Sequence, residues 1–270
     1  MAVRKRPTLA ESSDRHALYE ASVQCAETEI DFVDETFRRL RGRRARSLRE
    51  DFCGTAKVAC EWVRRGQRRT AIGVDRDPAV LAWGRRHNVA ALPSSAARRI
   101  ALVEGDVLTV RLPPVDLVLA MNFSYWVFKE RRRLRRYFRR AYAALLPDGI
   151  LYLDAYGGYE AFKVLKERTP YRGYTYVWHQ AAYDPISGDT LCHIDFKFED
   201  GSWLPRAFSY DWRLWTLPEL REVLTEAGFR RSTVYWQSSD LHTGRGDGVF
   251  LPVERGDPDA GWIAYIVAEK

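Results

Sequence analysis

One short stretch, Leu48–Ala56 followed by Ala71–Asp75, most constrains what this chain can fold into. The letters LREDFCGTA predict a strand that enters a tight turn at Gly54 and continues into a helix. The letters AIGVD predict the next strand, which ends on the carboxylate of Asp75. Such a unit is typical of α/β sheets that bind a nucleoside, because the turn lets backbone approach the ligand and the acid binds ribose hydroxyls.

Polar residues also follow the next predicted strands. Strands are predicted over residues 100–103 and 115–120, and the segments EGDV and MNFSYW follow them. The carboxyl ends of parallel strands share one edge of a sheet, so Asp106 and Asn122 are expected near Asp75. Further strands are predicted over 150–154, 230–236 and 261–268, with helices over 53–66, 77–88, 130–146 and 216–228 and a loop over 238–257.

Two other regions complete the predicted organisation. One amphipathic helix is predicted over residues 14–40, because apolar residues recur there at spacings of three and four. Residues 173–215 contain three β-like runs, 174–183, 190–199 and 203–215, which turn sequences separate. We therefore expect an N-terminal helical cap (1–44), an α/β domain (45–156 and 216–270) and an inserted antiparallel β-rich segment (157–215) that encloses a substrate.

The order of these elements and motifs resembles the class I S-adenosyl-L-methionine (SAM)-dependent methyltransferases, and the segments REDFCGT, NFSYW and YDWRLWT resemble a bacterial group of them. The resemblance implies a Rossmann-like sheet of seven strands, the last one antiparallel, with SAM as cofactor. Phe52 and Ala56 stand where the outer glycines of the first motif would be, which argues against a dinucleotide pyrophosphate. By resemblance, the cofactor contacts are Glu50 or Asp51, Cys53, Gly54, Asp75, Arg76, Asp106, Val107, Asn122 and Phe123.

The resemblance further implies methyl transfer to a nitrogen or oxygen nucleophile. The tetrad NFSY is loosely similar to the NPPY of amine methyltransferases, which makes Asn122 and Tyr125 the candidate catalytic residues. If the N-terminal helix covers the cofactor, Tyr19 and Gln24 are candidates to contact its carboxylate or amine. Tyr19 fits a core position on the apolar stripe of that helix equally well.

Charge leaves alternative functions open. The net charge is +7, and arginine runs at 38–49 and 131–140 suggest an RNA or protein methyltransferase as a second hypothesis. The second run surrounds an apolar stripe, which is typical of a solvated helix face. A third hypothesis is a non-catalytic SAM-binding regulatory module. The inserted segment favours a small-molecule acceptor over these alternatives.

Cysteines and histidines indicate neither a metal nor a disulfide framework. The four cysteines include no C-x-x-C pair, and His179, His193 and Asp195 lack the spacing of metal ligands. No apolar run approaches the ~18 residues of a membrane-spanning helix. We therefore expect no metal and a reduced, cytoplasmic setting.

Overall fold

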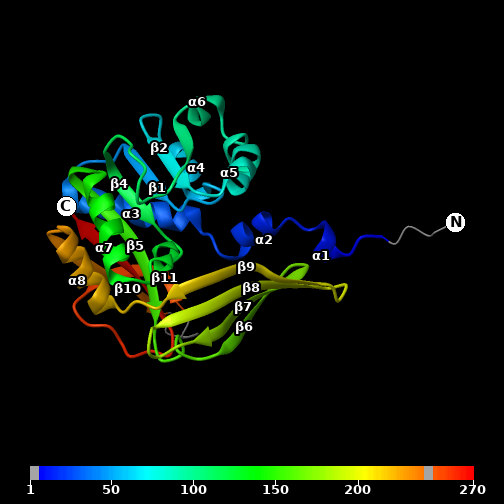
Figure 1. Cartoon of the computed structure of the whole chain (residues 1–270). Helices are drawn as coiled ribbons and strands as arrows, with labels where there is room; N and C mark the ends of the chain where they lie inside the picture. The colour runs from blue at the N-terminus through cyan, green and yellow to red at the C-terminus, as the bar shows by residue number, and fades with distance from the viewer. Residues whose placement is uncertain (1–5, 240–245) are drawn as a thin grey trace. The chain divides into compact units, whose positions relative to one another are not determined.

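The computed structural model describes residues 6–239 and 246–270, which divide into two compact units. The larger unit comprises Cys25–Gly158 and Trp215–Lys270, and the smaller one comprises the described residues up to Gln24 together with Tyr159–Leu214. Each unit is built on its own sheet (Figure 1). Residues that are far apart in the sequence therefore belong to one folded body in both units.

The larger unit contains, within its described residues, an eight-stranded sheet in the order β11-β10-β12-β5-β4-β1-β2-β3 (Figure 1). Strands β1 to β5 pair in parallel, whereas β12 is antiparallel to both β5 and β10. The Rossmann-like sheet with antiparallel strands at one side is thus confirmed. The strands are β1 (Ser47–Asp51), β2 (Thr70–Asp75), β3 (Ile100–Glu104), β4 (Val115–Ala120), β5 (Leu145–Gly157), β10 (Arg231–Ser239), β11 (Gly246–Val253) and β12 (Trp262–Glu269).

Strand β11 is one strand more than the seven expected, and it lies in the region predicted as a loop. It is an edge strand that pairs only with β10 among the described residues, and most of its residues are exposed. An exposed edge strand lacks the alternation of apolar and polar residues by which a strand is recognised in a sequence. The predicted loop over 238–257 is therefore wrong for residues 246–253.

Helices cover the two faces of this sheet. The helix α3 (Ala26–Arg41) and the helix α4 (Lys57–Arg64) share one apolar core with Leu48 and Leu117 of the sheet. Neighbouring residues of β1 point to opposite faces, so Glu50 bonds to α4 whereas Asp51 bonds to Tyr137 of the helix α7 (Arg131–Ala143). The remaining helices of this unit are α5 (Pro78–Gly84), the π-helical turn Arg85–Val89, α6 (Ser94–Ala97), the 3-10 turn Ser124–Val127 and α8 (Leu217–Ala227).

The single helix predicted over residues 14–40 is wrong. The helix α2 (Arg15–Ser22) ends within this range, at Ser22, and α3 begins after Cys25. The backbone of Cys25 (φ −118°, ψ 66°) is not helical. No glycine or proline marks this break, and the apolar spacing continues across it. Periodicity alone therefore predicted one helix where the chain passes from one unit to the other.

The smaller unit is a four-stranded antiparallel sheet in the order β6-β7-β8-β9, with α1 (Leu9–Ser12) and α2 at the start of the chain. The three predicted strands are present as β7 (Tyr174–Tyr183), β8 (Asp189–Phe198) and β9 (Trp203–Arg213). Strand β6 (Leu165–Tyr171) was not predicted, because it is almost wholly exposed and contains charged residues and a proline. In neither described range is there a helix with the length and apolar character needed to cross a membrane.

Candidate functional site

The turn after β1 has an unusual backbone. Phe52, Gly54 and Ala56 have φ values of 57°, 53° and 58°, in the left-handed region. This conformation costs a residue with a Cβ atom about 1–2 kcal/mol. Tertiary hydrogen bonds hold it, from the Cys53 N–H to the Val74 carbonyl (3.0 Å) and from the Gly54 N–H to Asp75 Oδ2 (2.9 Å). Phe52 and Ala56, which replace the outer glycines of the first motif, thus adopt the backbone conformation that glycine favours.

A cavity of about 120 Å³ lies at the carboxyl ends of β1, β2 and β3. The predicted cofactor residues Asp75, Arg76, Asp106 and Val107 all line it, so the structure brings these four together. Sequence reasoning missed the rings of Phe52 and Phe128 and the guanidinium of Arg133, and it noted Phe52 only as the replacement of a glycine. The complete lining is Phe52, Val74, Asp75, Arg76, Gly105, Asp106, Val107, Val127, Phe128 and Arg133.

The two acids of this cavity are fixed by backbone groups. Asp75 accepts hydrogen bonds from the N–H groups of Gly54 (2.9 Å) and Asp77 (3.0 Å), and Asp106 accepts one from the N–H of Leu108 (2.8 Å). A carboxylate has about four acceptor sites. Each acid therefore keeps acceptor capacity for the hydroxyl or amino groups of a ligand while its position is already set.

Glu50 and Asp51 have different surroundings. Asp51 is enclosed, forms an ion pair with Arg49 (2.6 Å) and accepts a hydrogen bond from the Tyr137 hydroxyl (3.0 Å). Burial raises the pKa of Asp51 although Arg49 opposes the shift. Burial also raises the pKa of Glu50, which accepts a bond from the Ala59 N–H (2.9 Å), and nearby Asp75 adds to that rise. Of the two acids, Glu50 is the one that faces away from the Arg49–Tyr137 cluster.

The loop after β4 is held by an acid that sequence reasoning did not single out. Asn122 and Phe123 both have left-handed backbones (φ 56° and 55°) and donate their N–H groups to the Asp154 carboxylate at 2.7 and 2.8 Å. Asp154 is near the end of β5, and burial raises its pKa to about 7. Its position near a strand end, like that of Asp75, was the signal that could have identified it.

Tyr125, the second candidate catalytic residue, is completely buried and donates its hydroxyl to the Asp154 carbonyl (2.7 Å). Burial raises the pKa of this hydroxyl well above its usual value. The arrangement favours support of the loop over contact with a ligand. By contrast, the Asn122 residue beside it is only partly buried.

The other eight predicted cofactor residues lie outside the cavity lining, namely Tyr19, Gln24, Glu50, Asp51, Cys53, Gly54, Asn122 and Phe123. Cys53 is buried, and its Sγ packs so closely on Gly73 that a Cβ there would lie 2.9 Å from it. Tyr19 and Gln24 belong to the smaller unit. There the Tyr19 ring packs 4.9 Å from that of Phe208, within an apolar cluster.

The carboxyl edge of the large sheet carries an excess of buried acidic groups. In the first turn of α3, Glu29 Oε2 is buried and has no hydrogen-bond partner among the described residues. Burial, and then the charge of Asp154, raise the pKa of Glu29 to about 7. Glu29 also raises the pKa of Glu50. This edge therefore fits a ligand that combines a nucleoside with a positive charge.

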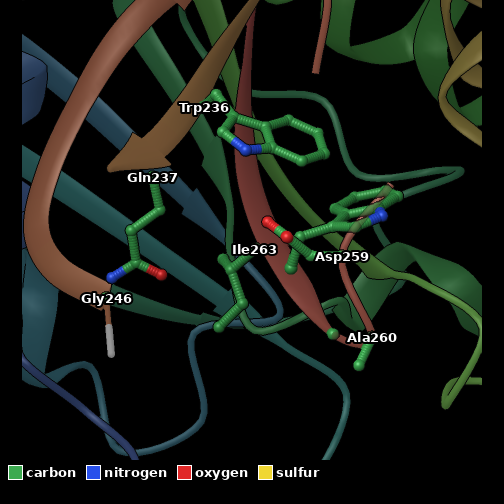
Figure 2. A pocket seen from close by; sticks show the side chains of 8 residues that line it. Trp236, Gln237, Gly246, Asp259, Ala260 and Ile263 are labelled. Carbon is green, nitrogen blue, oxygen red and sulfur yellow. The ribbon is translucent and has the colours of Figure 1, made fainter. Parts of the chain in front are cut away.

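A second hollow, of about 280 Å³, opens where β12 begins. The indole rings of Trp236 and Trp262 lie 4.9 Å apart, and Gly157 of β5 makes room for Trp262, because a Cβ there would come within 2.2 Å of that ring. Figure 2 shows the Asp259 carboxylate directed toward the space between Trp236 and Ile263. The lining is Trp236, Gln237, Gly246, Asp259, Ala260, Gly261, Trp262 and Ile263.

The histidines of the smaller unit do not assemble a metal site. His179 and His193 are cross-strand partners with rings 5.6 Å apart, and His193 Nδ1 bonds to the Ser209 hydroxyl (2.8 Å). Burial lowers the pKa of both histidines. Throughout residues 6–239 and 246–270, no group of three His, Cys, Asp or Glu side chains is placed to hold a metal ion.

Comparisons with known proteins agree with this geometry. A family model described as a methyltransferase domain matches residues 51–153. Among solved structures, an S-adenosylmethionine-dependent methyltransferase from Clostridium acetobutylicum ATCC 824 is 15% identical over 94% of this chain and 96% of that chain, with a TM-score of 0.66. No curated protein matches.

Two more solved structures are similar over nearly their whole length. CalS10, an amino pentose methyltransferase from Micromonospora echinaspora involved in calicheamicin biosynthesis, is 20% identical over 94% of this chain and 95% of its own, with a TM-score of 0.64. The sugar N-methyltransferase KedS8 from Streptoalloteichus sp ATCC 53650 is 19% identical over 100% of this chain and 98% of its own, with a TM-score of 0.63. At these identities the likeness establishes the fold.

The Asp51 cluster predicts a stability effect. Tyr137→Phe removes the hydroxyl that bonds to a fully buried carboxylate, so we expect the free energy of unfolding to fall by about 1–3 kcal/mol. Tyr142→Phe on the same helix is the control, because Tyr142 is only partly buried, and it should change stability by less than about 0.5 kcal/mol. Urea denaturation measures both. Equal stabilities of the two variants would show that the Tyr137–Asp51 bond contributes little.

Proposed function

We propose that the chain is a class I SAM-dependent methyltransferase, and that it transfers the methyl group of SAM to a nitrogen or oxygen nucleophile of a small molecule. One observation carries the proposal: Asp75 and Asp106 line a single cavity at the carboxyl ends of neighbouring parallel strands. Ligands of open α/β sheets bind at this edge. When bound, SAM supplies an electrophilic methyl group.

In this proposal each wall of the 120 Å³ cavity has a role toward the nucleoside half of SAM. Asp75 accepts the ribose hydroxyls, and Asp106 accepts the exocyclic amine of the adenine. The N–H of Val107 faces a ring nitrogen, and the rings of Phe52 and Phe128 pack on the base. Glu50, rather than Asp51, is the acid of the first motif that faces the cofactor, because Asp51 is already bonded to Arg49 and Tyr137.

The 280 Å³ hollow at the start of β12 supports a small-molecule acceptor. Aromatic faces pack on the apolar faces of rings and attract cations, and a carboxylate such as Asp259 binds ammonium or hydroxyl groups. CalS10 and KedS8 are described as methyltransferases of an amino pentose and of a sugar nitrogen. We extend this to an amine-bearing sugar or a similar ring as acceptor, with Asn122 orienting it between cofactor and hollow.

The arginine run on α7 offers less support for a nucleic-acid acceptor. Arg131 and Arg135 both form ion pairs with Glu226 of α8, so part of the run is neutralised within the unit. A cytoplasmic location, expected from cysteines that are all unpaired, remains part of the proposal. A non-catalytic SAM-binding module would bind SAM but would methylate none of a panel of amino sugars.

Asp75→Asn tests the ribose contact. We expect the SAM dissociation constant to rise roughly ten- to a hundredfold, because a charge-assisted acceptor becomes a neutral amide. Asp77→Asn is the control: Asp77 caps α5 through the Ala79 N–H (2.8 Å), and asparagine caps equally well. Isothermal titration calorimetry measures both variants. Wild-type affinity in Asp75→Asn would show that the ribose acid is misassigned.

Asp259→Asn tests the acceptor hollow. With an amino sugar that the protein methylates as the substrate, we expect KM to rise about tenfold or more while SAM affinity stays constant, because a charge-assisted contact to the acceptor is lost. Asp257→Asn removes the same charge two residues away, outside the lining, and should leave KM unchanged. Initial rates over a range of sugar concentrations provide the measurement. If the two variants have the same KM, the acceptor binds elsewhere.

Salt dependence separates the RNA alternative from the proposal. Binding to bulk tRNA should be weak, with a shallow slope of log K against log salt, because Arg131 and Arg135 of the run on α7 are already paired with Glu226. Filter binding between 50 and 200 mM salt gives the slope, in the range where about 6–10 phosphate contacts would change the affinity about 10³–10⁵-fold. Tight binding with that steep dependence would favour a nucleic-acid acceptor.

A further inference from the structure

Two buried carboxylates of the larger unit, those of Glu29 and Asp154, lack a basic partner. Each residue is only 7% exposed, and neither forms an ion pair with lysine or arginine within the described residues. Asp154 accepts the N–H groups of Asn122 and Phe123, whereas Glu29 Oε2 accepts no hydrogen bond from any described group. Buried charges in proteins are normally paired, so this pair requires an explanation.

Three elements surround the pair. Tyr265 of β12 is the direct cross-strand partner of Asp154, so their side chains lie on the same face of the sheet, which α3 covers. Phe32, one turn after Glu29, holds α3 on that face, because its ring lies 4.6 Å from the Tyr265 ring. The charges of Glu29 and Asp154 both add to the rise that burial causes in the pKa of Tyr265. Glu29 thus belongs to a packed, fixed arrangement.

The position of Glu29 in the first turn of a helix does not account for it. Acidic residues stabilise helix N-termini without being buried. Glu27 lies in the same first turn of α3 and is exposed. The dipole of the helix therefore acts on both residues, but only Glu29 is enclosed beside a second carboxylate. The helix dipole would stabilise Glu29 equally well if its side chain were exposed, so it does not explain why Glu29 is buried.

The pair continues the proposed cofactor site. The sheet order β5-β4-β1-β2-β3 places Asp154, Asn122, Glu50, Asp75 and Asp106 in succession along one edge. Glu29 interacts electrostatically with both Asp154 and Glu50, and Glu50 with Asp75. A nucleoside bound between β2 and β3 would therefore extend its other half along the edge toward Glu29 and Asp154.

We propose that Glu29 and Asp154 form a cation site for the methionyl half of SAM, and that they bind its positively charged sulfonium or ammonium group. This inference rests on the proposed cofactor site and deepens it. The product S-adenosylhomocysteine (SAH) keeps the ammonium group but has no sulfonium charge. If the pair binds the sulfonium group, the protein prefers the methyl donor to the spent product by charge alone.

Proton release follows from the same arrangement. Burial raises the pKa of Glu29 and of Asp154 to about 7 each. Glu50 interacts electrostatically with Glu29, and the phenol of Tyr265, which is neutral at this pH, lies within electrostatic reach of both acids. At pH 7 the two carboxyl groups of the ligand-free protein are therefore partly protonated. A bound cation stabilises the ionised carboxylates and lowers their pKa, so the proton is released to solvent. Affinity for SAM should then fall as pH drops below 7, because protons compete with the cation.

Glu29→Gln is the test, with Glu27→Gln as the control that removes one exposed charge from the same helix turn. Calorimetric titrations with SAM and with SAH at pH 6, 7 and 8, in two buffers of different ionisation enthalpy, give affinity and proton release. For the wild type we expect SAM affinity to rise by about tenfold from pH 6 to pH 8, as for one linked proton. Glu29→Gln should weaken SAM binding at pH 8 by at least about tenfold and flatten the pH dependence. Glu27→Gln should match the wild type.

The two ligands distinguish the two charges. Loss of affinity for SAM alone would assign the pair to the sulfonium, and equal loss for SAM and SAH would assign it to the ammonium; both outcomes support the proposal. Thermal unfolding checks that Glu29→Gln is folded, which we expect because glutamine keeps the shape and removes a buried charge. Wild-type affinities and wild-type proton release in folded Glu29→Gln would overturn the inference. A wild-type protein that binds no SAM would instead overturn the proposed function.

Discussion

The structure depends on one kind of interaction, a carboxylate near the end of a strand that accepts backbone N–H groups from a neighbouring loop or helix. Asp154 holds the loop after β4 in this way, Asp75 holds the turn after β1, and Glu50 holds the start of α4. These bonds fix loops whose backbones are locally unfavourable, since Phe52, Ala56, Asn122 and Phe123 all have positive φ values. The acids that shape the site are therefore needed whether or not a ligand is bound.

The same design concentrates negative charge at one edge of the sheet. Burial raises the pKa of Glu50, Asp154 and Glu29, and repulsion from neighbouring acids adds to the rise for Glu50 and Glu29. The nearby buried base, Arg49, is bonded to Asp51 on the other face of β1. A cationic ligand relieves this repulsion, whereas an anionic one would increase it. The electrostatics of the edge thus favour a nucleoside that carries positive charge over a dinucleotide, whose pyrophosphate would meet a row of acids.

The sequence allowed the part of the site that lies on strand ends to be predicted. Asp75 and Asp106 follow apolar runs directly, so their place at the sheet edge follows from the alternation of strands and helices. Glu29 could not be found in this way, because an acid in the first turn of a helix is ordinary until another element buries it. Sequence reasoning missed the break between α2 and α3 and the edge strand β11 for a related reason. Neither tertiary contacts nor the crossing of the chain from one unit to the other changes the spacing of apolar residues.

Phe52 and Ala56 give the most instructive difference between pattern and structure. Both residues have side chains where a glycine-rich turn would have none, yet both adopt the left-handed backbone, since the bonds to Val74 and Asp75 hold the turn around them. Glycine at position 52 would leave the backbone bare for a phosphate. The phenyl ring there instead lines the cavity, with its centroid 5.9 Å from that of Phe128. The Phe52 side chain thus occupies the place where backbone would otherwise contact a phosphate, and a nucleoside without phosphate does not need that contact.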